Sequence, residues 1–461
     1  MFKLYPLVVC SVFMLTGCVS LAPAYQQPES PVPQQFSLSR NTLAPAVSGY
    51  QDTGWRTFFA DPQVKYLIAE ALRNNRDLQM AVLKVQEARA QYNVTDADRY
   101  PQLNASSDAE FSGGLKGDRA TAKTFTAGLK LSLEPDFFGK LKNMSEADRQ
   151  NYFASLEAQR AVHILLIANV SQNYFNQRLA TEQLNISRET LQNYQQSYAF
   201  TERQLFSGSA NLLALEQARG MIASTEANIA KREGELAQAN SALQLLLGSY
   251  SALPSEPFNA IKKLNLVRLP ANLSSAILLQ RPDIMEAEHR LRAANANIGA
   301  ARAAFFPSVS LTGGVSGSAA DLSTLFNASS GLWNFVPKID IPLFNAGRNQ
   351  ASLKLAEVRQ QQSVVNYEQK IQTAFKEVAD ALSLRASFSG QLAGQQRYLA
   401  SLQITLQRAR GLYSSGAVSY LEVLDAERTL FTTRQAILDL EYALQVNEIK
   451  LFTALGGGWV E

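Results

Sequence analysis

Two short segments with alternating apolar and polar residues lie between long helical patterns in the first half of the chain. In the second segment the apolar positions are Phe125, Ala127, Leu129, Leu131 and Leu133, with polar or small residues between them. A period of two predicts a β-strand with one apolar and one polar face. We therefore expect strands at about 102–113 and 125–134.

The same arrangement occurs again in the second half of the chain, with strands expected at about 308–316 and 334–344. Pro101 and Pro307 are 206 residues apart, and so are Asp77 and Asp283. Similarity at a fixed offset indicates an internal duplication. Each unit is predicted to contain a helix, two strands, a long helix, a turn and another helix, over 61–273 and 274–461.

The apolar faces of these strands have few strand-like partners elsewhere in the chain. A lipid bilayer is the remaining environment for such a face, since strands of about 9–11 residues span it. The polar faces would then line a water-filled interior. On this side we place four charged residues, namely Lys130, Glu134, Lys338 and Asp340.

Long helical patterns surround the strands, and the one at 141–205 contains no proline. They are expected at 62–99, 141–205, 212–247, 349–412 and 420–455. The two longest would each extend close to 100 Å, which requires lateral support from other helices, as in a coiled coil. Tight glycine-containing turns are expected at about 203–212 and 410–420, and an irregular segment at 248–273.

The N-terminus has the features of an exported lipoprotein. Residues 1–17 read as a signal peptide, and the run Leu15-Thr16-Gly17-Cys18 matches the site at which bacterial lipoproteins are cleaved and lipidated at the cysteine. Residues 18–60 are rich in proline, which predicts an extended tether. After cleavage no other cysteine is left, so an intrachain disulfide and a free thiol nucleophile are excluded.

The charge balance indicates no polyanion partner, and an export signal with four lipid-suited strands and no spanning helix indicates the outer membrane. The formal net charge of +3 is nearly balanced, and no later stretch is apolar enough for a transmembrane helix. Four strands cannot close a barrel, and open sheet edges do not survive in lipid, so the chain must associate. Three copies would supply twelve strands, although the strand pattern alone leaves two or four copies open.

Several motifs resemble the TolC-like outer membrane factors. They are Gly-Trp-Arg-Thr-Phe-Phe-Ala-Asp-Pro at 54–62, Leu-Gln-Arg-Pro-Asp-Ile at 279–284, Ala-Ala-Phe-Phe-Pro at 303–307 and the two glycine turns. The resemblance covers essentially the whole mature chain. Two further stretches are Phe-Asn-Ala-Gly-Arg-Asn-Gln at 344–350 and Leu-Gly-Gly-Gly-Trp at 455–459. Through them the chain most resembles, within this family, the outer membrane lipoproteins of Cus/Sil-type copper and silver efflux systems.

The resemblance implies a trimer with a twelve-stranded β-barrel above a periplasmic α-helical barrel. It also implies a periplasmic adaptor and an inner membrane pump of the resistance-nodulation-division class as partners. The family's adaptor-docking pattern fits Arg203, Leu205 and Gly208 at the first turn; it fits Arg410, Leu412 and Gly416 at the second with one extra residue. The acidic residues that close the family's periplasmic mouth correspond to Glu422 and Asp425, which Arg428 could offset.

The resemblance implies a passive export duct for monovalent copper and silver ions. No catalytic activity is expected, and no cofactor besides the lipid on Cys18. A multidrug efflux channel and a protein-secretion conduit are the alternatives. Neither of the two histidines, His163 and His289, has a second His or a Cys near it in the sequence, and the methionines are scattered. A copper or silver site would favour clustered Met, Cys or His, so no metal site is predicted.

Overall fold

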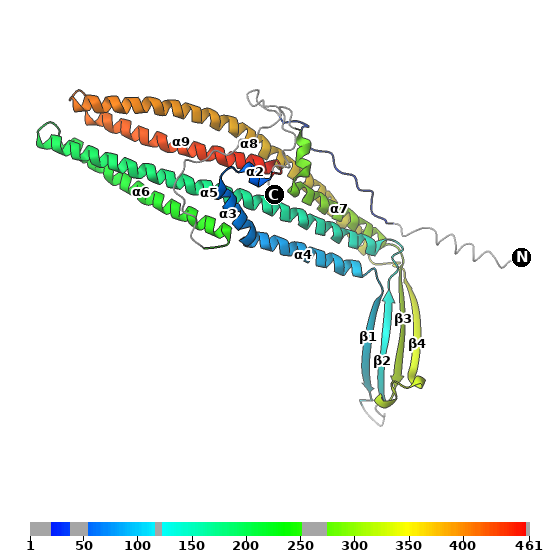
Figure 1. Cartoon of the computed structure of the whole chain (residues 1–461). Coiled ribbons are helices and arrows are strands. Elements are labelled where there is room, and N and C mark those ends of the chain that lie inside the picture. The colour runs from blue at the N-terminus through cyan, green and yellow to red at the C-terminus, as the bar shows by residue number, and fades with distance from the viewer. Residues whose placement is uncertain (1–19, 37–53, 116–121, 251–273, 458–461) are drawn as a thin grey trace. The chain divides into compact units, whose positions relative to one another are not determined.

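A computed structural model describes residues 20–36, 54–115, 122–250 and 274–457 (Figure 1). The helices are α2 (Trp55–Phe58), α3 (Pro62–Asn74), α4 (Arg76–Ala97), α5 (Lys140–Phe206), α6 (Leu212–Leu247), α7 (Pro282–Ala303), α8 (Arg348–Ser414) and α9 (Tyr420–Ala454), with short 3-10 turns η3 (Ser275–Gln280), η4 (Leu322–Thr324) and η5 (Ala328–Ser330). The strands are β1 (Gln102–Ser112), β2 (Ala122–Leu133), β3 (Ser308–Ala319) and β4 (Gly331–Asp340). The signal peptide, Cys18, residues 37–53 of the tether and residues 251–273 lie outside the described residues.

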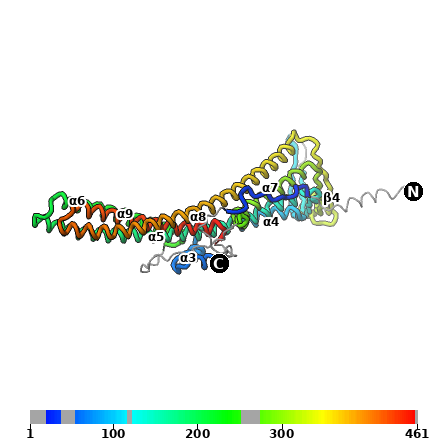
Figure 2. Tube along the Cα trace, turned by 90° about the horizontal axis from the view of Figure 1, so that it is seen from above, coloured from blue at the N-terminus to red at the C-terminus, as the bar shows by residue number. Residues whose placement is uncertain are grey.

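The chain forms two compact units. The first comprises Met1–Ser30, Val82–Ala158 and Asp283–Lys370, and the second comprises Pro31–Ala81, Gln159–Pro282 and Ile371–Glu461. The sheet belongs to the first unit. In the second unit α6 and α9 run alongside the C-terminal parts of α5 and α8 (Figures 1 and 2).

The four strands form one antiparallel sheet in the order β1-β2-β3-β4. Directly paired residues share a face, so the register tests the predicted alternation. Leu129 pairs with Ala105 of β1 and with Val315 of β3, and Val315 pairs with Trp333 of β4. One face is therefore apolar across all four strands, as the period of two predicted.

Gly128 allows β2 and β3 to approach closely at the centre of the sheet. A Cβ atom at this position would lie 2.6 Å from the Cβ of Ser316 and 2.6 Å from the carbonyl oxygen of Val315. Real Cβ atoms do not approach backbone this closely, so a side chain here would force the strands apart. A glycine inside a strand commonly marks such a close approach.

The last strand differs from the expected 334–344. It begins at Gly331 and ends at Asp340, so residues 341–344 lie beyond the sheet. Pro342 has no amide hydrogen and cannot donate to a ladder at this point, which explains why the pairing stops. The third strand is longer than predicted and reaches Ala319.

The predicted continuous helix over 62–99 is wrong. It is two helices, α3 and α4, that meet at Asn75, whose backbone is extended (φ −63°, ψ 131°). The Asn75 side chain stabilises the break: its Oδ1 accepts from the Leu78 amide at 3.0 Å, and its Nδ2 donates to the Leu246 carbonyl at 2.9 Å. A residue that caps a helix with its side chain competes with continuation of the preceding one.

The second repeat has an equivalent break at Arg281, 206 residues after Asn75. Arg281 is also extended (φ −68°, ψ 136°) and precedes α7. Its guanidinium donates to the Ala454 carbonyl at 2.8 Å. Ala454 follows Leu246 by 208 residues, so both break residues bind the C-terminal end of the short helix in their own repeat. The predicted duplication therefore extends to a matched junction within the second unit.

The core of the second unit contains aromatic and charged side chains between the helices. Trp55 and Phe59 are fully buried, and the rings of Phe58 and Phe452 stack with centroids 4.0 Å apart. On α9 the carboxylate of Glu448 is 0% exposed and receives two hydrogen bonds from Arg385 of α8, one of 2.6 Å from Nε to Oε1. This bidentate pair fixes how α8 and α9 align along each other.

Candidate functional site: the polar sheet face and the helical tips

Three of the four predicted interior residues lie on the polar face of the sheet. Lys130 pairs with Asn104 of β1 and with Gly314 of β3, on the face opposite the leucine row. Lys338 pairs with Ser310, and Asp340 pairs with Ser308. The polar face therefore carries amides, hydroxyls and a few charges, which suits contact with water.

Glu134 lies one residue beyond the end of β2 and is not part of the ladder. Its carboxylate forms an ion pair of 3.6 Å with Lys140, the first residue of α5. Both side chains are about two-fifths exposed, so this pair contributes little to stability. Glu134 thus lies at the junction between strand and helix, together with Asp340 in a cleft that Phe138 and Phe306 also line.

Each long helix ends in the same kind of turn. Gly208 (φ 76°) and Gly416 (φ 74°) both adopt the left-handed conformation in which glycine is strongly favoured. The amide of Gly208 donates to the Leu205 carbonyl and that of Ser209 to the Gln204 carbonyl. In the second turn the amide of Gly416 donates to the Tyr413 carbonyl, and that of Ala417 donates to the Leu412 carbonyl.

These hydrogen bonds align the two turns residue by residue. Gly416 corresponds to Gly208, so Tyr413 corresponds to Leu205 and Gly411 corresponds to Arg203. Arg410 and Leu412 are therefore one residue out of step with Arg203 and Leu205. Arg203 is exposed in the last turn of α5, whereas Arg410 is committed to a partner within the chain.

That partner is Glu427 of α9, whose side chain is only 5% exposed. The Arg410 guanidinium donates to the Glu427 carboxylate at 2.7 Å. Burial raises the pKa of Glu427, and the hydrogen bond and charge of Arg410 only partly offset this. Burial and the nearby Glu427 charge raise the pKa of Tyr194 to about 12.

The predicted gate residues lie on the first turns of α9. Glu422 and Asp425 are exposed, whereas Val423 and Ala426, each one residue further along, are buried in a cluster with Tyr420 and Leu406. Arg428 forms an ion pair of 2.7 Å with Asp425, as its spacing predicted. Asp425 and Arg428 are both more than half exposed, so the pair is free to exchange partners.

A shallow groove of about 490 Å³ connects the tip residues with this face of α9. It is lined by Ile404, Arg408, Leu412 and Glu422, among others. Ile404 is 61% exposed and Leu412 is 47% exposed. Exposed apolar side chains that surround a groove with charged rims are typical of a surface that meets another protein.

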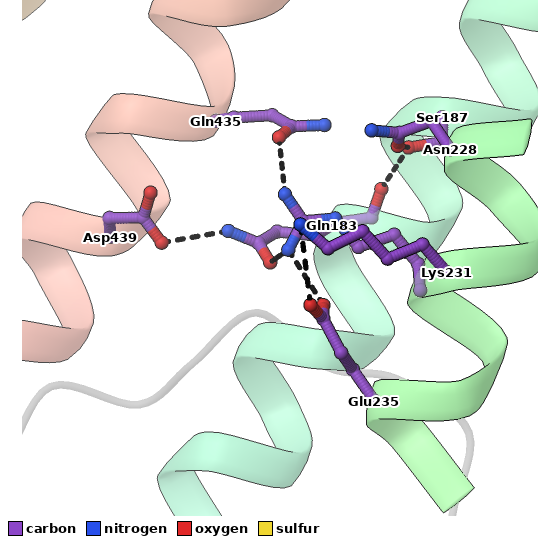
Figure 3. Close-up of polar contacts among 8 residues, drawn as sticks. Gln183, Ser187, Asn228, Lys231, Glu235, Gln435 and Asp439 are labelled. Atoms are coloured by element: carbon purple, nitrogen blue, oxygen red, sulfur yellow. Dashed lines mark hydrogen bonds and ion pairs between the residues drawn. The ribbon is translucent and has the colours of Figure 1, made fainter. Parts of the chain in front are cut away.

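A polar cluster that the sequence did not reveal joins three helices of the second unit (Figure 3). Arg232 of α6 donates to Gln183 of α5 at 2.6 Å and to Gln435 of α9 at 2.7 Å. Gln183 in turn donates to Asp439 of α9 at 2.7 Å. These residues are 49 to 256 positions apart, so no local pattern could have identified them. The cluster ties α9 to the α5–α6 pair.

Among the residues that the structure describes, no group of three or more His, Cys, Asp or Glu side chains could hold a metal ion. His289 is half-buried on α7, 2.7 Å from the Gln150 side chain, and burial lowers its pKa. Within the described ranges no helix is long and apolar enough to cross a membrane. Cys18 lies outside these ranges, so its lipidation stays a prediction.

Comparison with known proteins identifies a family and several relatives that the chain resembles. The family described as outer membrane efflux protein matches residues 67–249 and 273–457. The chain is 72% identical to the probable outer membrane lipoprotein SilC of Salmonella typhimurium over 461 residues, the full length of both. It is 71% identical to the cation efflux system protein CusC of Escherichia coli K12 over 456 residues, with 99% of each chain covered. It is 38% identical to the solvent efflux pump outer membrane protein SrpC of Pseudomonas putida over 476 aligned positions, again with 99% of each chain covered.

Solved structures agree with these relatives. A crystal structure of CusC, described in terms of folding and transmembrane channel formation, matches with a TM-score of 0.89 and 70% identity, covering 95% of this chain and 100% of that one. The open state of the Neisseria gonorrhoeae MtrE outer membrane channel matches with a TM-score of 0.87 and 34% identity, covering 96% and 99%. The predicted fold class and outer membrane location are thereby confirmed, and the chain belongs to the outer membrane efflux protein family.

Proposed function

We propose that three copies of this chain close a twelve-stranded barrel in the outer membrane, and that their helices form a periplasmic conduit below it. The observation that carries this proposal is the sheet: one face is apolar across all four strands, while β1 and β4 have no outer partner among the described residues. Unpaired strand edges are costly in lipid, and pairing β4 of one copy with β1 of the next removes them.

The proposed cargo is monovalent copper and silver, exported by passive passage rather than by catalysis. Support comes from the relatives at 71–72% identity, one of which is named as a cation efflux protein. The polar sheet face offers Lys130, Lys338, Asp340, amides and hydroxyls, which are hard or positively charged groups. Soft metal ions bind such groups weakly, so a duct of this kind would release its cargo.

The tips and the start of α9 are proposed to meet the periplasmic partners. Arg203, Leu205 and Gly208 on one side, with Leu412 and Gly416 on the other, would contact the adaptor that connects the conduit to a resistance-nodulation-division pump. Glu422 and Asp425 would form acidic rings at the mouth, which attract cations. A lipid on Cys18 would anchor each copy to the membrane.

A multidrug channel is the second candidate, favoured by the 38% identity to the solvent efflux protein SrpC. A protein-secretion conduit would have a similar tube. Deletion of the gene in its host separates the three candidates. We expect sensitivity to silver and copper salts with unchanged drug tolerance; sensitivity to solvents and drugs alone would contradict the metal assignment, and loss of a secreted protein alone would favour the conduit.

Docking at the tips is tested in the same host with Gly208→Val. Valine is strained at φ 76°, although a Cβ there has nothing within 4 Å, so the change distorts the turn without a clash. Gly220→Val is the matched control, because Gly220 lies inside α6 with equally open space. We expect metal tolerance to fall about tenfold for the tip variant and to stay near wild type for the control. Equal tolerance of the two variants would contradict docking at this turn.

A further inference from the structure

Three sides of α7 are covered in the first unit, and the fourth side is open. The first side packs on α5, where Ala147 meets Ala293 and Ala296. The second side carries a buried stripe of Ile284, Leu291 and Ile298. The α8 helix also runs beside α7, and Asn349 of α8 donates to the Ala304 carbonyl at 2.6 Å.

The third side of α7 is covered by residues 20–30, which we name the strap; its trace follows α7 in Figure 2. Asn295 donates to the Pro23 carbonyl at 2.8 Å, and Arg302 donates to the Leu21 carbonyl at 3.3 Å. The Tyr25 hydroxyl donates to Glu288 at 3.2 Å. At Gly299 a Cβ would lie 2.7 Å from the Ala22 amide, so the strap lies directly on the helix.

The open side of α7 carries a groove of about 420 Å³ that α5 and α8 also line. Its polar lining consists of Asn151 of α5, Arg290 and Asn297 of α7, and Ser352 and Arg359 of α8. At about 100° per residue, Arg290 and Asn297 lie roughly opposite the stripe that holds the strap. The strap and the groove therefore occupy opposite faces of the same layer of helices.

This opposition shows which face of the layer is the inner one, an argument that rests on the proposed function. The strap begins two residues after Cys18, and Ser20 is fixed by a 2.8 Å hydrogen bond to Asn143 near the start of α5. A lipid on Cys18 enters the membrane outside the barrel, so the strap covers the outer face. The groove then faces the conduit. Other copies would meet this layer at its edges, α4 and α8, because α7 lies between α5 and α8.

We propose that this groove is an anion-binding site in the wall of the conduit, with Arg359 and Arg290 as the charged groups. Arg290 forms an ion pair of 2.6 Å with Glu286, so its charge is largely offset. Arg359 has no ion-pair partner within the described part of the chain, which leaves one net positive charge beside two amides and a hydroxyl. A guanidinium with amide donors around it suits a small oxyanion such as phosphate or sulfate.

The test places a thiol inside the groove. Ala356 lines it one turn before Arg359, and the side chain of Arg359 leans toward that turn. With Cys18 acylated, the variant Ala356→Cys carries a single free thiol. Channels in planar bilayers are treated with two methanethiosulfonate reagents of similar size, one bearing a sulfonate and one a trimethylammonium group, and the rates of the conductance change are compared.

We expect the anionic reagent to be favoured in this background and the ratio of the two rates to fall about threefold when Arg359→Gln is added. Millimolar inorganic phosphate should slow the anionic reagent only when Arg359 is present. Arg302→Gln is the matched control, because Arg302 lies on the strap side and should leave the ratio unchanged.

Three results would overturn the proposal. If the ratio of the two reagent rates is the same with and without Arg359, the groove holds no positive site. A thiol at position 356 that does not react in conducting channels would show that the groove lies outside the conduit, while the channel itself stands. Channels that fail to conduct in every variant would refute the conduit and the groove together.

Discussion

Replacing Arg385 by methionine leaves the carboxylate of Glu448 buried without its partner. Glu448 is 0% exposed and Arg385 is 13% exposed, and their two hydrogen bonds join α8 to α9. The neighbouring Asn447 is only 2% exposed, and its side-chain amide donates to the Ala381 carbonyl at 2.8 Å, so the pair lies in a buried layer between the two helices. Removing one member of a buried ion pair costs about 3–5 kcal/mol.

That cost can be converted into a decrease of the melting temperature. Unfolding entropy of about 2.1 cal/mol/K per residue gives on the order of 1 kcal/mol per degree for a chain of 461 residues. We therefore expect the midpoint of thermal unfolding, followed by circular dichroism at 222 nm, to fall by roughly 3–5 °C.

Two further variants test the reasoning. Arg397→Met makes the same change at an exposed position of α8 and should lower the midpoint by less than about 1 °C. Arg385→Met combined with Glu448→Met replaces the whole pair by apolar groups and should recover most of the loss. A double variant as unstable as the single one would show that an uncompensated charge at Glu448 is not the cause of the loss.

Two predictions concern the tip and the sheet. Because burial raises the Glu427 pKa above 4.5, the folded state holds this proton more tightly than the unfolded state, and its stabilising contribution is lost as the pH rises through the raised pKa. The melting temperature of Glu427→Gln should therefore rise relative to that of the wild type between pH 5 and pH 8. A difference in melting temperature that does not change with pH would contradict the burial argument. Gly128→Ala, with a Cβ 2.6 Å from a backbone carbonyl, should abolish the bilayer conductance, whereas Gly313→Ala, whose nearest contact would be 3.6 Å, should retain it. Equal conductance of the two glycine variants would show that the strands can separate without loss of the barrel.

The elements that local pattern controls could be read from the sequence. The alternation from Phe125 to Leu133 predicted the apolar sheet face, and long proline-free stretches predicted α5 and α8 to within a residue or two. The helix after Pro62 was predicted in one piece because Asn75 is an ordinary helix residue by pattern. Its side chain ends the helix only because the Leu246 carbonyl lies within reach, 171 residues away.

The candidate site was predictable to the same extent. The exposed positions of Glu422 and Asp425 and the ion pair with Arg428 follow from helical spacing. The commitment of Arg410 to Glu427 does not, because it depends on the pairing of α8 with α9 across the turn. The cluster around Arg232 and the groove beside Arg359 likewise require three helices to be placed together before they exist.

In the proposed assembly, copies of this chain complete each other's sheet. Within one copy β1 and β4 are separated by two strands, about 14 Å at the usual spacing, which is beyond the reach of a disulfide. A scan of cysteine pairs, one on β1 and one on β4, oxidised in membranes and separated by mass, tests the claim most directly. We expect cross-linked products that end at three copies; a chain that stays monomeric for every pair, or a ladder that ends at another number, would contradict it.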